Sequence, residues 1–373
     1  MSRRTLRRLG LGLIALAVVA AGGYSLYWHR LAATVRNAIP AWAAARQAEG
    51  WAVSHGSVTV GGFPFDLRVA VPAPRIETPD GVAWSAPDLA AVISPLAPNR
   101  IRVQPAGRQE LLVPVAGRYR AFRLEAGAAR GVLNLAARGA EALTLHLEQV
   151  AAWEGGKGRD EHVVRMAVLD VALDLPRHQA PAEHTTTTAA LSAAARDVDL
   201  PAVAATALGN RIAELGLKAR LQGALSADVS LTEALARWRD VGGTVEIERL
   251  AVRWDPLDLE IDGTLALDGG LQPLAAMTGK IRGYAEAVDS FVRSGLVRPE
   301  DGRSVKLVLA IMGRVPTNGG APVITVPLTV QDQKFLVGPV ALMTLPRILW
   351  PSTEIVLPEA AGAGGSSTPD GRR

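Results

Sequence analysis

An uncharged run of 20 residues near the N-terminus constrains this chain more than any other feature. It extends from Leu9 to Trp28. At about 1.5 Å per residue, a helix of this length crosses the roughly 30 Å of a hydrocarbon core. Because basic residues stay on the cytoplasmic side, we expect the N-terminus in the cytoplasm and the following chain beyond the membrane. The basic residues before the run are Arg3, Arg4, Arg7 and Arg8.

A cleaved signal peptide is the competing interpretation of this segment. Residues 18–20, with the sequence VVA, resemble a small-residue cleavage site. The apolar run continues past that point, however, to Tyr24, Tyr27 and Trp28. Aromatic rings of this kind are enriched where a spanning helix reaches the membrane interface. We therefore favour an uncleaved, single-pass anchor over residues 9–28.

Residues 29–49 are predicted to form a helix beyond the anchor. Leu31, Val35 and Ile39 recur at helical spacing, and Pro40 is expected to kink the helix or restart it. The apolar stripe either packs on the body of the protein or lies on the membrane surface. We favour packing on the body, because the anchor already supplies membrane attachment.

The net charge of the chain comes from its N-terminal tail. Lysine and arginine total 40, aspartate and glutamate total 36, and removing the four arginines of the tail leaves 36 of each sign. A nucleic-acid surface needs clustered basic residues that replace counterions at phosphates, so this balance argues against a nucleic-acid partner. The chain has no cysteine, which excludes disulfides, thiolate metal sites and a cysteine nucleophile.

From residue 50 the hydrophobic pattern changes to alternation with a period of two. Apolar and polar residues alternate over 143–148, 169–175 and 257–261, which is typical of antiparallel strands with one face on a core and the other in water. Further strands are predicted over 56–61, 65–71, 100–104, 110–115, 119–125, 131–137, 217–229, 244–253, 264–268, 271–279 and 323–338. Helices are predicted over 198–215, 281–294 and 301–312, with a short one from Thr232.

These elements predict an α+β fold, in which long antiparallel sheets carry a few helices packed on one face. A polar loop over 177–188 ends in four consecutive threonines and divides the body into two related halves. The predicted parts are a cytoplasmic basic tail (1–8), the anchor (9–28), a juxtamembrane helix (29–49), a first β-rich half (50–176), the linker loop (177–188), a second β-rich half (189–358) and a disordered tail (359–373).

The sequence offers no catalytic constellation, cofactor fingerprint or metal cluster. His178 and His184 share a polar loop but lack the rigid convergence that a metal site needs. The segment GGFPF, from Gly61 to Phe65, is predicted to be a structural corner whose aromatic side chains anchor the turn in the core, rather than a ligand site. Side chains expected on solvated strand faces are His146, Asp258 and Asp262.

Several short motifs follow one another in a distinctive order. They are Gly61–Phe65, Trp84–Pro87 with Asn99, Trp238–Gly243, Trp254–Leu257, Gly263–Leu265 with Leu267–Asp268, Val337–Pro339 and Leu345–Pro346. In this order they resemble the bacterial family called domain of unknown function 2125. The resemblance implies a membrane-anchored envelope protein of Gram-negative bacteria and brings no catalytic residues. Asp255 stands where the family pattern has glycine, so that turn does not demand glycine.

The strand runs are also similar to those of AsmA-like envelope proteins, whose long sheets are associated with lipid handling. Together these features predict a non-enzymatic protein, anchored in the inner membrane, with its body in the periplasm. Many aliphatic residues on curved sheets with partial helix cover favour an apolar groove that binds lipid. The alternatives are an envelope scaffold that binds another protein along a sheet edge, and a hydrolase without a recognisable motif.

The anchor predicts the topology of the whole chain. A reporter that is active only in the periplasm should be active when it is fused after Arg373, because the arginines hold the N-terminus in the cytoplasm. Replacing the four arginines of the tail with glutamate should weaken this orientation. Full activity of a cytoplasm-only reporter at the same fusion point would contradict the prediction.

Overall fold

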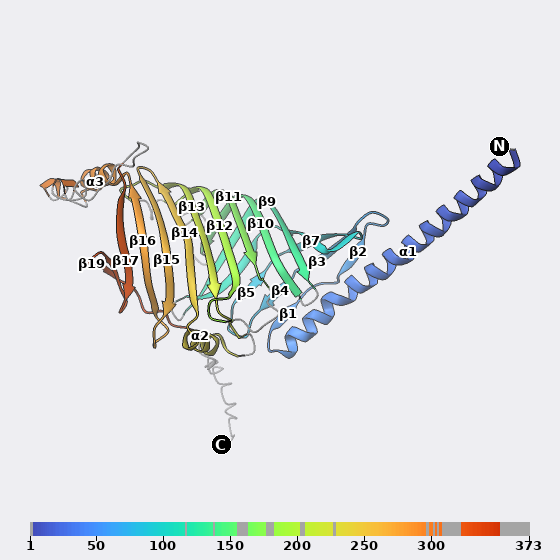
Figure 1. Cartoon of the computed structure of the whole chain (residues 1–373), viewed down its shortest axis with the longest axis horizontal. Helices are drawn as coiled ribbons and strands as arrows, with labels where there is room; N and C mark the ends of the chain where they lie inside the picture. Colours follow the sequence, from blue (N-terminus) through green and yellow to red (C-terminus); the bar gives the residue numbers. More distant parts are fainter. Residues whose placement is uncertain are drawn as a thin grey trace, which may run out of the picture.

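In the part of the chain that the structure describes, one long N-terminal helix is followed by a large antiparallel sheet with short helices at its margins (Figure 1). The predicted α+β class, an apolar helix joined to a β-rich body, is confirmed. The structure is a computed structural model that describes residues 3–115, 118–136, 139–154, 163–176, 183–201, 206–226, 229–295, 298–300, 303, 306–307 and 322–350. The predicted tail over 359–373 lies outside the described residues.

The first helix, α1 (Arg3–Ala48), joins the predicted anchor and the predicted juxtamembrane helix into one rod. Pro40 lies inside α1 instead of ending it. Residues 11–23 are exposed, and α1 is long and apolar enough to cross a membrane. A protein core does not account for this apolar stretch, because its side chains contact none of the described body.

The C-terminal half of α1 packs on the body. Trp28 and Ala32 are 4% and 3% exposed, and they are buried against Leu67, Val69 and Ile93. This confirms the expectation that the stripe after the anchor packs on the body. Leu67 and Val69 lie on the third strand of the sheet, and Ile93 lies on the sixth. The first strands are β1 (Ala52–Ser54), β2 (Thr59–Gly61), β3 (Leu67–Pro72), β4 (Arg75–Glu77), β5 (Ala83–Ser85), β6 (Asp88–Ser94), β7 (Ala97–Ala106) and β8 (Gln109–Val115).

The remaining strands form a long meander in which each pairs with the next (Figure 1). Local turns favour this antiparallel order. The strands are β9 (Arg118–Ala136), β10 (Gly139–Glu154), β11 (Val164–Asp174), β12 (Thr187–Asp199), β13 (Arg211–Gln222), β14 (Thr244–Trp254), β15 (Leu257–Leu267), β16 (Pro273–Arg282), β17 (Ile324–Gln331), β18 (Lys334–Val337) and β19 (Val340–Thr344).

The sheet forks at β9, which is one strand where the sequence predicts two. The N-terminal part of β9 pairs with β8, and its C-terminal part pairs with β7. One branch continues from β7 through β6 and β3 to β2, and the other from β8 through β5 and β4 to β1. Because β10 pairs along the length of β9, both branches join the same meander.

The predicted linker over 177–188 does not separate two sheets. Strands β11 and β12 lie on either side of it and pair directly over their length. The predicted halves therefore share one continuous sheet. Residues 177–182 lie outside the described residues, and the last two threonines of the loop already belong to β12.

Short helices lie at the margins of the sheet (Figure 1). The first, α2 (Leu231–Asp240), is capped by Ser230, whose side chain accepts a hydrogen bond from the Glu233 amide, so the predicted cap at Thr232 is wrong by two residues. The second, α3 (Tyr284–Arg293), confirms the helix predicted over 281–294. The helix predicted over 198–215 is wrong, because this segment ends β12 and begins β13.

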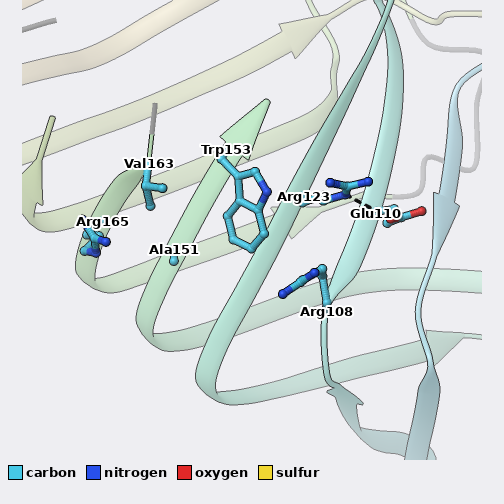
Figure 2. Close-up of a pocket in the computed structure, with 7 residues that line it drawn as sticks. All are labelled: Arg108, Glu110, Arg123, Ala151, Trp153, Val163 and Arg165. Atoms are coloured by element: carbon cyan, nitrogen blue, oxygen red, sulfur yellow. Dashed lines mark hydrogen bonds and ion pairs between the residues drawn. The ribbon is translucent and has the colours of Figure 1, made fainter. Parts of the chain in front are cut away.

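In β10 and β12 the alternation of buried and exposed residues shifts by one residue part-way along the strand. Leu147 and Val150 are both buried although they are three residues apart, and the Gln149 between them has φ 52°. Ala195 and Val198 repeat this arrangement around Asp197, with φ 49°. A left-handed residue twists a strand sharply and re-aims the side chains beyond it. The inner side thus stays apolar, and the strand that carries Ala151 and Trp153 is curved (Figure 2).

Replacing Leu67 with alanine should lower the free energy of unfolding by about 2–5 kcal/mol, because the side chain is 0% exposed and the deletion leaves a cavity under α1. Leu225→Ala is the matched control, since Leu225 is 38% exposed. Urea unfolding of the full chain in detergent micelles measures both. Equal losses at the two positions would contradict this packing.

Candidate functional site

The cross-strand register aligns aliphatic residues of the central strands into rows that run across the sheet. Residues that lie directly opposite one another in neighbouring strands point to the same face. One row consists of Leu133, Leu143, Leu173, Leu191, Ala219 and Ile247. The next consists of Gly131, Leu145, Val171, Ala193, Leu217, Leu250, Ile261, Gly279 and Val326. We call the surface formed by these two rows the apolar face.

The apolar face is continuous with the surface beneath α1. Gly131 lies opposite Val103, and Leu133 lies opposite Ile101. From β7 the rows continue through β6 to Val69 and Leu67 on β3, which pack against the helix. One aliphatic surface therefore extends from α1 to β17.

Among the described residues, helices cover the apolar face at its ends but not in its middle. At the β17 end, Tyr284 of α3 packs with Ile261, Ile324 and Val326. On the central strands the side chains of Leu143, Leu145, Val171, Leu173 and Leu217 are only half-buried, and Leu191 is 37% exposed. These residues belong to none of the four core clusters formed by the described residues.

The opposite face of the same strands is polar. Its charged side chains form cross-strand ion pairs with N···O distances of 3.2 to 3.9 Å, and all are at least one-third exposed. The predicted solvated position of Asp258 and Asp262 is confirmed, because both belong to these pairs. The pairs are Arg130–Glu148, Arg196–Asp170, Arg220–Glu246, Lys280–Asp262 and Arg282–Asp258.

His146 is the centre of a charged network on the polar face. Its Nδ1 lies 2.6 Å from Asp170 Oδ1, and its Nε2 lies 3.2 Å from Glu148 Oε1. The hydrogen bond to Asp170, followed by that to Glu148, raises the pKa of His146 above its ordinary value of 6.5. Arg196 and Arg130 pair with the same two carboxylates. His146 and Asp170 therefore both have charged partners. The two residues border an open depression of about 360 Å³.

A second depression, of about 420 Å³, contains three arginines (Figure 2). The guanidinium of Arg108 lies 5.1 Å from the Trp153 ring centroid, and Arg123 Nε lies 3.2 Å from Glu110 Oε1. Arg108 also pairs with Glu125 at 3.5 Å. Because carboxylates neutralise two of its arginines, this depression is a solvated, ion-paired surface rather than a concentrated anion site.

The GGFPF corner is a turn between β2 and β3, but its aromatic residues do not anchor a core. Phe65 is 82% exposed, so the prediction that it fills the core is wrong. Phe63 is 50% exposed and contacts the rings of Trp28 and His29 on α1. Alternating patterns reveal which strand residues face inward, but a turn has no such alternation.

Of the predicted loop histidines, His184 is exposed and His178 lies outside the described residues. Within the described ranges, no three histidine or carboxylate side chains come together as a metal site would need. Sequence reasoning missed the apolar face as a set of residues. The alternation in single strands signalled it, whereas its continuity depends on the register between strands.

An apolar N-terminal helix joined to one amphipathic antiparallel sheet defines the class of this protein. The chain belongs to a bacterial protein family described as "Uncharacterized protein conserved in bacteria (DUF2125)", whose match covers residues 28–346. This confirms the resemblance seen in the sequence. No curated protein and no solved structure matches the chain.

Replacing Asp170 with asparagine should lower the pKa of His146, because Asp170 is the main cause of its rise. The raised pKa means that the folded chain binds this proton more tightly than the unfolded chain. The contact therefore stabilises the fold below pH 6.5, and the stabilisation disappears as the pH rises through the raised pKa. Histidine NMR titration measures the shift.

Asp174→Asn is the control for this titration. Asp174 is exposed and lies four residues further along β11. The Asp174→Asn substitution should leave the pKa of His146 unchanged. An unchanged pKa in the Asp170 variant would contradict the network.

Proposed function

We propose that this protein is anchored in the bacterial inner membrane by α1, holds its sheet in the periplasm and binds lipid acyl chains along the apolar face. The partial exposure of the central leucines is the observation that supports this proposal. A ligand that removes the apolar side chains of these rows from water lowers the free energy by about 25 cal/mol for each Å² of apolar surface that it buries.

Several features favour acyl chains as the ligand. The residues of the apolar face are aliphatic or glycine on every central strand. A saturated chain forms no hydrogen bonds, so it needs only a continuous apolar surface. The rows also lead back to α1, which crosses the membrane in this proposal. In this role the protein is a binding protein and not an enzyme.

A scaffold role remains the second candidate, and the edges of the sheet support it. Within the described part of the chain, β19 pairs only with β18, and Met343 on β19 is 58% exposed. An edge strand of this kind can accept an added strand from a partner protein. The partner would then bind through backbone hydrogen bonds and leave the apolar face free.

Exchanging Leu145 and Leu217 together for asparagine should reduce lipid binding by more than tenfold. Each buried leucine contributes about 1.5–3 kcal/mol, and about 1.4 kcal/mol corresponds to a factor of ten in affinity. The full chain is placed in phospholipid nanodiscs that contain a phospholipid with a photoactivatable acyl chain. Crosslinks to peptides of β10–β13 are then quantified by mass spectrometry.

The matched control exchanges Thr144 and Lys218 for asparagine. These residues are the exposed neighbours of the two leucines on the opposite face. Crosslinks in the control should equal those of the unchanged protein and should persist at high salt, because apolar burial is not screened. Crosslinks confined to α1 in the unchanged protein would overturn the lipid proposal.

A further inference from the structure

Two neighbouring turns project large apolar side chains into open space. Phe63 and Phe65 lie in the turn between β2 and β3, where they are 50% and 82% exposed. Leu96 lies in the turn between β6 and β7 and is 89% exposed. Exposed apolar clusters of this kind mark surfaces that contact a membrane or a partner.

Both turns are fixed to α1. The Tyr24 hydroxyl donates a hydrogen bond to the carbonyl oxygen of Pro64. The Tyr27 hydroxyl donates one to the carbonyl oxygen of Pro95 over 2.7 Å. The Phe63 ring lies edge-on to Trp28, with ring centroids 5.4 Å apart. The two turns are therefore held beside the helical turn that ends the uncharged run.

Their position along α1 sets their depth relative to a membrane. The uncharged run ends at Trp28, so Tyr24 lies about 6 Å deeper along the helix axis. A helix that crosses a bilayer with this run places residues 24–28 in the outer interface. Groups fixed beside these residues lie at the boundary between headgroups and acyl chains.

Basic residues lie directly behind the apolar tips. Arg30 follows Trp28 by two residues on α1 and is exposed. Arg68 on β3 and Arg102 on β7 flank Val92 in the register, both are exposed, and Arg102 lies 3.9 Å from Asp66. Apolar tips backed by basic residues match the chemistry of a phospholipid leaflet, in which acyl chains lie beneath anionic phosphates.

We propose that Phe63, Phe65 and Leu96 insert into the outer leaflet of the membrane that α1 crosses. This proposal rests on the anchoring part of the proposed function. The insertion holds the body at one orientation and places the β3 end of the sheet at the bilayer surface. The same tips explain why Phe65 is aromatic in spite of its exposure: its partner is lipid, not the core.

The absence of cysteine allows single labels to test the insertion. Phe65→Cys and Leu96→Cys are made separately in the full chain, spin-labelled and reconstituted into vesicles of phosphatidylethanolamine and phosphatidylglycerol. Power saturation then compares access of lipid-soluble oxygen with access of a water-soluble nickel chelate. Labels at both positions should favour oxygen several-fold more than a label at a solvated position.

Val241→Cys supplies the solvated position, because Val241 is 61% exposed and lies at the end of α2. Vesicle flotation of the same samples checks the anchor. A chain that does not float overturns the anchoring itself. A chain that floats with nickel access at residues 65 and 96 equal to that at residue 241 overturns the insertion alone. Labels shielded from both reagents also overturn it, because they show a protein partner or a second copy on the tips.

Discussion

The removal of aliphatic side chains from water on one face of a continuous antiparallel sheet is the interaction on which the rest of this structure depends. The rows that begin at Leu67 and Val69 include at least one leucine on every strand from β9 to β14. At both ends helices complete the burial, through Trp28 on one side and Tyr284 on the other. In the middle the same rows are half-buried, so further removal of these side chains from water would lower the free energy.

The helix α1 has two environments along one continuous rod. Residues 11–23 contact nothing in the described body, whereas Trp28 and Ala32 belong to its core. The body is therefore incomplete without the helix, since a soluble fragment that begins at residue 50 would expose the surface around Leu67 to water. The helix α1 and the sheet form one structural unit, so in the proposed role the orientation of the helix in a membrane would set the orientation of the sheet.

The two faces of the sheet differ in chemistry: one carries exposed ion pairs and the other carries aliphatic side chains. Exposed cross-strand ion pairs such as Arg130–Glu148 and Lys280–Asp262 each contribute little to stability, because water screens them. They keep this face hydrated, so the opposite, apolar face is the one that would meet the proposed lipid ligand. The chemistry of His146 belongs to this hydrated face, where its carboxylate partners keep it charged over a wider pH range.

The sequence by itself determined the apolar helix, most of the strands and the facing of residues such as Leu143 and Asp258, because helical length and a period of two are local properties of the chain. Only the tertiary structure decided the register that joins these leucines into rows, the fork at β9, and the merging of two predicted halves into one sheet. Strand register and branching depend on contacts between residues far apart in the sequence, which local patterns do not specify. For the same reason the exposure of Phe65 was decided by the position of its turn beside α1.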